Sequence, residues 1–212
     1  MNADYLELAN QQFHNKNYQD ALANYDLAIQ NCPSLPEAYY RRGLVKRIMG
    51  NHPEAIQDLS IATILNPKMV SAYYYRGISY YETGDFPYAI ANYNHAIFLD
   101  PKLANAYYQR AIIRGELGYT HQAIKDFKLA ASLAREQNNS YLYKRARKAQ
   151  VLAKNLKGSN RYNKALLIAF KVGLLTAIAA ITIGNIKYFN EKINERENYQ
   201  KSLLEQLKKT NN

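Results

Sequence analysis

The side chains best suited to catalysis or metal binding are few in this sequence of 212 residues. Such sites bring several groups together at set spacings, as in HExxH, a phosphate-cradling glycine loop or a nucleophile elbow, and none of these motifs occurs. His14, His52, His95 and His121 share no common spacing, and Cys32 has no histidine near it in sequence. The sequence therefore predicts no enzyme activity, no catalytic residue, no metal site and no cofactor.

The elements that must position the remaining side chains recur with a 34-residue period. Small residues recur at two phases with a bulky side chain between them, and glycine recurs where a turn is expected. The sets are Ala21, Ala55, Ala89 and Ala123; Ala28, Ala62, Ala96 and Ala130; Tyr25, Leu59, Tyr93 and Phe127; and Gly50, Gly84 and Gly118. This period predicts stacked pairs of helices of about a dozen residues, with the bulky side chain buried where backbones approach.

Three segments carry a resemblance to a known family: YYRRG at 39–43, YYYRG at 73–77 and YYQRA at 107–111. With second helices that end in NP or DP, they resemble tetratricopeptide repeats. The resemblance implies an all-α fold, a right-handed superhelical stack of four helix pairs plus a capping helix. It assigns repeats to 2–35, 36–69, 70–103 and 104–137, followed by a basic capping helix and linker at 138–164.

The resemblance also implies that the first helices of the repeats line a concave groove that binds a partner protein. One tyrosine of each run (Tyr39, Tyr73, Tyr107) is expected in the core, with its neighbour facing the groove. Tyrosine and arginine dominate binding hot spots, although packing between neighbouring repeats is an alternative role for these rings. The candidate groove residues are Asn10, Phe13, Tyr40, Arg41, Arg47, Tyr74, Tyr75, Tyr81, Tyr108 and Gln109.

Some repeat domains of co-chaperones hold a C-terminal carboxylate with a Lys/Asn/Asn/Lys/Arg set. The matching positions in the first three repeats hold Leu6, Asn10, Arg41, Ser71 and Tyr75. Only the asparagine agrees, so chaperone tails are not the expected partner. The sequence instead favours an apolar or aromatic segment with some acidic character opposite Arg41 and Arg47.

The net charge of +11 is concentrated after the repeats. Residues 1–140 carry 13 basic and 13 acidic side chains, so they lack the positive field that nucleic-acid backbones require. We therefore expect no nucleic-acid partner. Residues 141–164 carry eight basic side chains and no acidic one, which suits anionic lipid headgroups, the alternative being a solvated helix face. They are Lys144, Arg145, Arg147, Lys148, Lys154, Lys157, Arg161 and Lys164.

An apolar stretch, ALLIAFKVGLLTAIAAITI at 165–183, follows this basic run and contains one charge, Lys171. As a helix it would be roughly 28 Å long, close to the thickness of a bilayer core. We therefore predict a transmembrane helix over 165–186, against the alternatives of a buried helix closing the stack or an interfacial helix. Because more basic residues precede it than follow it, a single-pass protein with the repeats on the cytoplasmic side is expected.

The small-residue pairs Gly173/Ala177 and Ala180/Gly184 suggest helix–helix association within the membrane. Residues 187–212 predict a charged C-terminal helix or tail. The combined expectation is a membrane-anchored adaptor or scaffold, a receptor or assembly factor whose groove captures a partner segment for a membrane-associated complex. The alternative is a stoichiometric structural subunit of a larger membrane complex.

Overall fold

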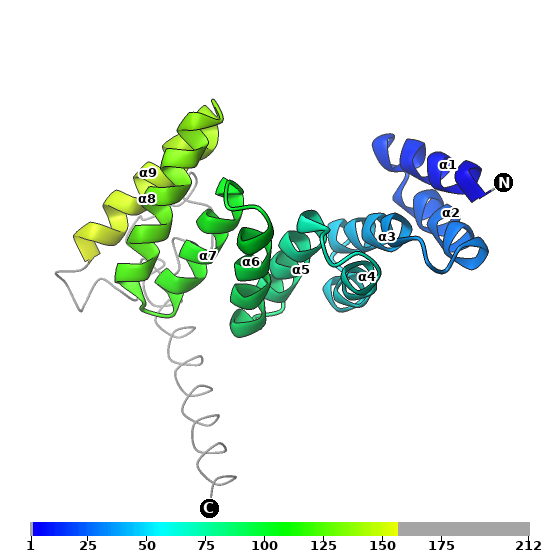
Figure 1. The fold of residues 1–212 in the computed structure, drawn as a ribbon, viewed down its shortest axis with the longest axis horizontal. Coiled ribbons are helices and arrows are strands. Elements are labelled where there is room, and N and C mark those ends of the chain that lie inside the picture. The colour runs from blue at the N-terminus through cyan, green and yellow to red at the C-terminus, as the bar shows by residue number, and fades with distance from the viewer. Residues whose placement is uncertain (1, 157–212) are drawn as a thin grey trace, which may run out of the picture. The chain divides into compact units, whose positions relative to one another are not determined.

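The computed structural model of the protein describes residues 2–156. Within that range the chain forms nine α-helices and no strand (Figure 1). They are α1 Asn2–His14, α2 Tyr18–Asn31, α3 Pro36–Ile48, α4 His52–Leu65, α5 Val70–Glu82, α6 Phe86–Leu99, α7 Ala104–Glu116, α8 Thr120–Glu136 and α9 Ser140–Leu156. The helices up to Val151 form one compact unit, which we call the first unit.

Within the first unit the helices pack as successive pairs. α1 contacts α2, α3 contacts α4, α5 contacts α6 and α7 contacts α8. Each pair then contacts the next, because α2 packs on α3, α4 on α5 and α6 on α7. The first helices also touch one another in the order α1, α3, α5, α7, so they share one face, which we name the first-helix face. This arrangement confirms the stacked helix pairs that the 34-residue period predicted.

The turns inside the pairs depend on glycine. Gly50, Gly84 and Gly118 have φ angles of +84°, +84° and +81°, a left-handed conformation that glycine adopts without steric strain. After α3, the amide of Gly50 donates to the carbonyl of Arg47 and that of Asn51 to Lys46, which satisfies the end of the helix. These positions confirm the predicted turns. Asn138 takes the same left-handed conformation, with φ of +56°, between α8 and α9.

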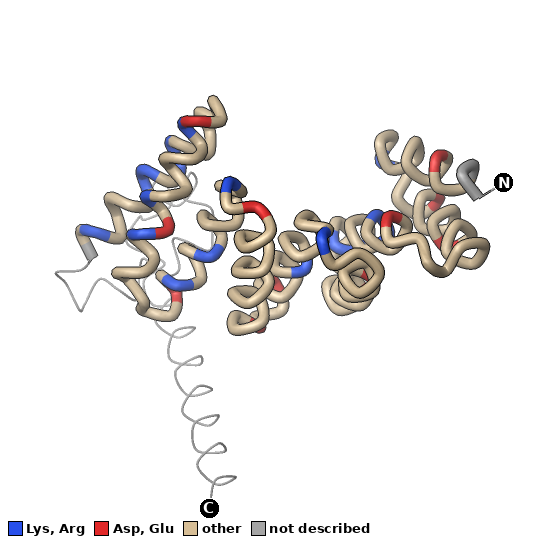
Figure 2. The backbone as a smooth tube through the Cα atoms, in the orientation of Figure 1, with Lys and Arg blue, Asp and Glu red and all other residues tan. Residues whose placement is uncertain are grey.

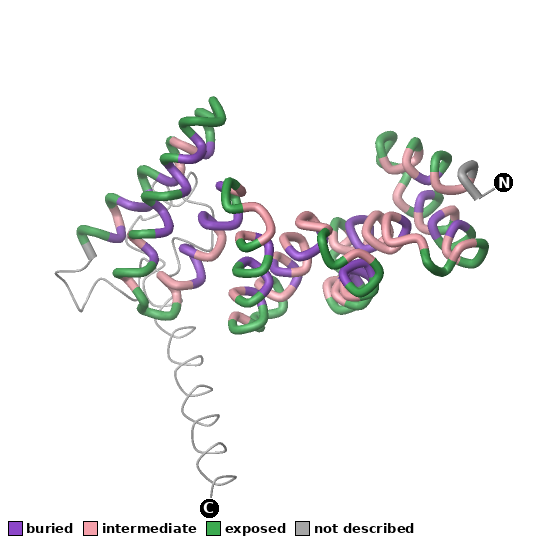
Figure 3. The backbone as a smooth tube through the Cα atoms, viewed as in Figure 1, coloured by how far each residue is buried: buried purple, intermediate pink, exposed green. Residues whose placement is uncertain are grey.

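The core lies between the two helices of each pair and continues between each pair and the next first helix, and buried residues recur along the whole stack (Figure 3). Tyr25, Leu59, Tyr93 and Phe127 are each no more than 1% exposed, as their shared phase predicted. The helices approach so closely that a Cβ at Gly77 would lie 2.8 Å from Cε1 of Tyr93, and one at Gly43 would lie 3.0 Å from Cγ of Leu59. The bulky side chain of the second helix therefore packs directly against the backbone of the first helix at the position of the glycine.

The tyrosine runs follow the expected inward and outward pattern only in part. Tyr73 and Tyr107 are buried, at 9% and 8% exposure, as predicted. Tyr39 is only half-buried. In the last pair Arg135 stands where the earlier units have a proline, and α8 continues past it to Glu136. The basic helix α9 follows after a three-residue turn.

No helix within residues 2–156 combines the length and apolar character needed to cross a membrane. The predicted span at 165–186, the charged segment at 187–212 and the end of the basic linker fall outside the described residues.

Candidate functional site

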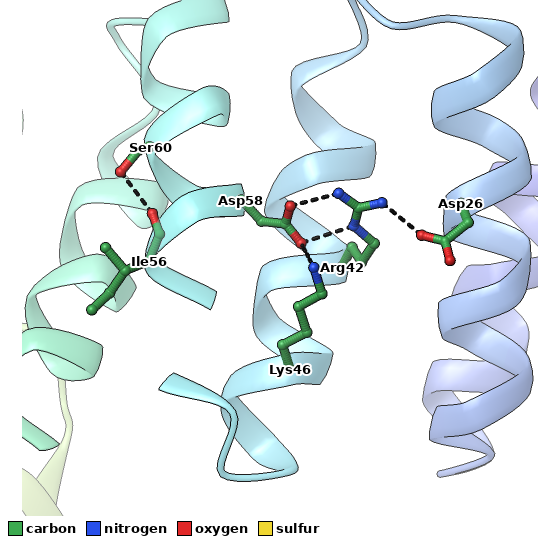
Figure 4. A network of polar contacts seen from close by, with 6 residues as sticks. All are labelled: Asp26, Arg42, Lys46, Ile56, Asp58 and Ser60. Atoms are coloured by element: carbon green, nitrogen blue, oxygen red, sulfur yellow. Dashed lines mark hydrogen bonds and ion pairs between the residues drawn. The ribbon is translucent and has the colours of Figure 1, made fainter. Parts of the chain in front are cut away.

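Three arginines that recur with the 34-residue period, Arg42, Arg76 and Arg110, join neighbouring repeats. The guanidinium of Arg42 on α3 donates two hydrogen bonds to Asp58 on α4, from Nε at 2.8 Å and from Nη2 at 2.6 Å (Figure 4). Its Nη1 donates to Asp26 on α2, in the preceding pair, at 2.6 Å. Hydrogen bonding to Asp58 raises the pKa of Arg42, so this guanidinium stays charged.

Arg110 repeats this geometry two repeats later. Its Nε and Nη2 donate to Asp126 on α8 at 2.8 Å each, and its Nη1 donates to Asn94 on α6 at 2.6 Å. A second cation reaches each buried carboxylate: Lys46 lies 2.7 Å from Asp58, and Arg114 lies 2.7 Å from Asp126.

Arg76, in the third repeat, has neutral partners. Its Nε donates to Asn92 at 2.7 Å, and its Nη1 donates to Ser60 at 3.1 Å and Thr63 at 2.9 Å. Burial lowers the pKa of Arg76, which has no carboxylate against it among the residues that the structure describes.

Sequence reasoning missed this arginine set, although its signal was present. Arg42, Arg76 and Arg110 share the 34-residue period, and so do their acceptors Asp58, Asn92 and Asp126. Each guanidinium also lies over the tyrosine ring that precedes it by one helical turn, 5.3–5.6 Å from the centroid. These arginines therefore act inside the stack, where neighbouring helices accept their hydrogen bonds.

A different group of side chains gathers on the first-helix face, across α3 and α5. We name Tyr40, Arg41, Arg47, Tyr74 and Tyr75 the aromatic–arginine patch. The Tyr75 ring centroid lies 6.2 Å from that of Tyr40 and 5.1 Å from that of Tyr74. The guanidinium of Arg47 lies 5.1 Å from the centroid of Tyr75, and that of Arg41 lies 5.7 Å from Tyr40. All five residues are half-buried, so each keeps part of its surface open.

Hydrogen bonds connect Tyr40 and Tyr74 of the patch each to the next first helix. Burial raises the pKa of the Tyr40 hydroxyl, and a hydrogen bond with Ser71 on α5 acts in the opposite direction. Burial likewise raises the pKa of Tyr74, whose hydroxyl bonds with Gln109 on α7. The rings are thus fixed before any partner arrives, which lowers the entropy lost on binding.

The two arginines of the patch differ in what they contact. Arg41 donates from Nε to Glu37 at 2.6 Å on its own helix. The side chain of Arg47 makes no hydrogen bond or ion pair to any described residue, and its Nε is buried without a partner. A buried donor without an acceptor is unfavourable, since it loses its hydrogen bonds to water. Arg47 is therefore the donor on this face with most to gain from an added acceptor.

The structure gives the other predicted groove residues separate environments. Asn10 accepts a hydrogen bond from the Tyr25 hydroxyl at 2.8 Å, and Phe13 packs against the Ala9–Ala21 core of the first pair. Tyr81 donates to Glu116 at 2.8 Å. All three belong to contacts that hold the helices together.

Tyr108 differs from the open position expected of a groove residue, because it is only 8% exposed. Its ring meets Phe127 edge-on, with centroids 5.6 Å apart, and the guanidinium of Arg145 on α9 lies 5.2 Å from its centroid. Little of Tyr108 is left for a partner to touch.

The predicted headgroup residues also separate into two kinds. Lys144, Arg147, Lys148 and Lys154 are exposed on α9. Arg145 is half-buried between the rings of Tyr108 and Tyr141, 5.2 Å and 5.4 Å from their centroids. Arg145 therefore serves the packing of α9, and the expectation that it faces lipid does not fit its position. Lys157, Arg161 and Lys164 lie outside the described residues.

Comparison with known protein families agrees with this architecture. Residues 79–118 match the family model described as TPR repeat, and residues 104–137 match the model described as tetratricopeptide repeat. The chain contains tetratricopeptide repeats. A search of curated protein sequences finds no match.

Solved structures with tetratricopeptide folds resemble the chain over much of its length. A crystal structure of MamA matches with a TM-score of 0.68 at 20% identity, covering 86% of this chain and 97% of MamA. The first TPR of Spaghetti (RPAP3), bound to the HSP90 peptide SRMEEVD, matches at 0.54 and 21% identity, covering 55% and 93%. The Arabidopsis OM64 TPR domain matches at 0.52 and 25% identity, covering 53% and 93%. These likenesses establish the tetratricopeptide fold.

Proposed function

We propose that the protein is an adaptor whose first-helix face captures a segment of a partner protein, and that residues 165–186 hold it at a membrane. The observation that carries the first half is the aromatic–arginine patch on α3 and α5. Its rings are fixed and partly open, and Arg47 has no acceptor among the described residues. Tyrosine and arginine in such a setting are the residue types that dominate binding energy in protein interfaces.

Two considerations support a peptide segment as the ligand. First, the arginines at the 34-residue period are used within the stack, whereas Arg47 is not. Second, the RPAP3 domain of similar fold is described with a bound peptide. The patch combines ring faces with a guanidinium, so it suits an aromatic or apolar segment that carries a carboxylate.

The membrane half of the proposal rests on the sequence of residues 165–183, which is apolar apart from Lys171. A chain anchored in this way would raise the local concentration of a captured partner at the membrane without any further contact. By resemblance, proteins of this layout serve as receptors or as assembly factors for membrane complexes.

Capture is tested by placing a photo-reactive phenylalanine analogue at Tyr75 of the full chain in cells. Tyr88 on α6 is the matched control, because it is 62% exposed and belongs to a second helix. We expect a defined crosslinked partner from position 75 and none from position 88. The partner should be lost when Arg47→Ala is added to Tyr40→Ala. Equal crosslinking at positions 75 and 88 would refute the proposal. If the double variant still co-purifies with one partner at a fixed stoichiometry, the structural-subunit alternative is favoured.

Anchoring is tested separately by washing isolated membranes with alkaline carbonate. The full chain should remain in the membrane pellet, and a variant lacking residues 165–186 should be released. Release of the full chain would remove the membrane half of the proposal and leave the capture half standing.

A further inference from the structure

The outward side of α9 combines exposed apolar and basic side chains. Tyr141 and Val151 are 63% and 49% exposed, although both are large hydrophobic residues. Lys144, Arg147 and Lys148 lie between them in sequence and are exposed as well. Spacings of three and four residues place these five on one side of a helix, and we name this side the outer α9 face.

The opposite side of the helix is buried. Leu142, Ala146, Ala149 and Gln150 are each no more than 4% exposed. The exposed Tyr141 and Val151 of the outer α9 face therefore lie opposite the buried side of this helix.

The charge of the outer α9 face is of one sign. Helix α9, Ser140–Leu156, contains no acidic residue, and lysine and arginine positions recur along it (Figure 2). Arg147 donates to Gln150 at 2.8 Å, and neither Lys144 nor Lys148 pairs with a carboxylate of the described chain. Nothing among the described residues neutralises these three cations.

Tyr141 is held in position by a neighbour. The guanidinium of Arg145 lies 5.4 Å from its ring centroid and donates from Nη1 to its hydroxyl at 3.3 Å. The same guanidinium lies over Tyr108 of α7, so the exposed ring is connected to the repeat core. An exposed tyrosine fixed in this way presents an apolar ring with a polar edge, the form that suits a membrane–water interface.

We propose that the outer α9 face lies against a bilayer that contains anionic phospholipids, with Lys144, Arg147 and Lys148 on the headgroups and Tyr141 and Val151 at the acyl boundary. Lysines beside an aromatic and an aliphatic residue are typical of interfacial helices. An RNA partner would use the cations and the ring, whereas Val151 gains nothing from a phosphate backbone. The inference deepens the membrane half of the proposed function, since the predicted span starts at residue 165, within roughly 30 Å of chain from the end of α9 at Leu156.

The chain contains no tryptophan, so Tyr141→Trp provides a single reporter on the outer α9 face. The control is Tyr88→Trp on α6. Each full-length variant is reconstituted into vesicles of phosphatidylcholine alone or of equal parts phosphatidylcholine and phosphatidylserine, with brominated acyl chains as the quencher. We expect a blue shift and quenching of the reporter at position 141 in the anionic vesicles, weakening as salt is added, and neither change for the control reporter at position 88.

A second pair of variants tests the lysines. Lys144→Gln with Lys148→Gln should reduce the quenching of the reporter at position 141, with each lysine worth about fivefold in binding. Lys125→Gln with Lys128→Gln on α8 should leave that quenching unchanged.

The inference and the proposed anchor can fail separately. If the reporter at position 141 stays unquenched in anionic vesicles while the chain resists carbonate, the inference fails and the anchor stands. If carbonate releases the chain and the reporter is still quenched, the anchor fails and the inference stands. A spectral shift of the same reporter by RNA that equals the shift by vesicles would also overturn the inference.

Discussion

Arg42 and Asp58 form a bidentate ion pair in which the carboxylate is almost fully covered. The Nε–Oδ2 and Nη2–Oδ1 distances are 2.8 Å and 2.6 Å, and the Asp58 side chain is only 3% exposed. The same arginine contacts Asp26, whose side chain is 53% exposed, at 2.6 Å. One guanidinium therefore makes one buried ion pair and one surface ion pair, so their contributions to stability can be compared.

Asp58→Ala should lower the free energy of unfolding by about 3–5 kcal/mol, because it leaves Arg42 and Lys46 without their shared anion. Asp26→Ala should change it by less than about 1 kcal/mol, since an exposed ion pair is screened by solvent. Chemical denaturation of the two variants beside the parent chain measures both values. Equal losses would show that the buried pair has no special role.

Gly77→Ala should destabilise the fold even though alanine is a better helix former. The new Cβ would lie 2.8 Å from the Tyr93 ring, which is 1% exposed and has no room to move. Overpacking of this kind costs about 1–3 kcal/mol, and helix propensity offsets up to about 1 kcal/mol of it. Gly115→Ala on α7 is the control, because its Cβ would meet only Ala123 at 4.0 Å. The unfolding temperature should fall for Gly77→Ala and hold or rise for Gly115→Ala; the reverse order would contradict the packing shown here.

Stability should decline at alkaline pH as buried tyrosines are forced to ionise. Burial raises the pKa of Tyr25 from 10.0 to about 12, so this hydroxyl stays protonated in the folded chain after the unfolded chain has lost its proton. Its contribution is complete below pH 10 and is lost between pH 10 and pH 12, by roughly 2 kcal/mol at the upper end. Tyr25→Phe should flatten this slope, at a loss of about 1 kcal/mol near neutral pH from the missing bond to Asn10. An unchanged alkaline slope in the Phe variant would exclude Tyr25 as its source.

The HSP90 peptide SRMEEVD should not bind this chain at concentrations at which the RPAP3 domain takes it up. The positions that would hold its terminal carboxylate carry Leu6, Ser71 and Tyr75 in place of three basic side chains. Fluorescence anisotropy of the labelled peptide measures this directly, with the RPAP3 domain as the positive control. Saturable binding that disappears in Asn10→Ala would contradict the expectation.

The repeat phase was readable from the sequence because its determinants are local. The small residue at Gly77 and the bulky one at Tyr93 each recur with the 34-residue period, and a glycine at each turn supports the same phase. The arginine contacts were harder to predict. The partners of Arg42 lie 16 residues away on two different helices. Both residues are arginines on α3, and residue type alone does not show that Arg42 contacts the neighbouring second helices while Arg47 lies on the first-helix face.

Tyr108 illustrates a second limit of sequence reasoning. Its phase within the repeat equals that of Tyr40 and Tyr74, and it was expected in the groove for that reason. No further repeat follows it among the described residues, and Arg145 of α9 lies over its ring instead. Position within a repeat predicts exposure only when the neighbouring unit is also a repeat.

The arginine contacts have a consequence for how such a chain can change its length. Arg42 reaches 16 residues back to Asp26 and 16 forward to Asp58, and Arg110 does the same with Asn94 and Asp126. Excising or duplicating one whole 34-residue block would leave every guanidinium facing an oxygen of the right kind, with Arg110 meeting Ser60 once the third block is removed. Gene rearrangements in whole blocks therefore keep these contacts, whereas the loss of a few residues inside a block would leave a buried carboxylate without its arginine.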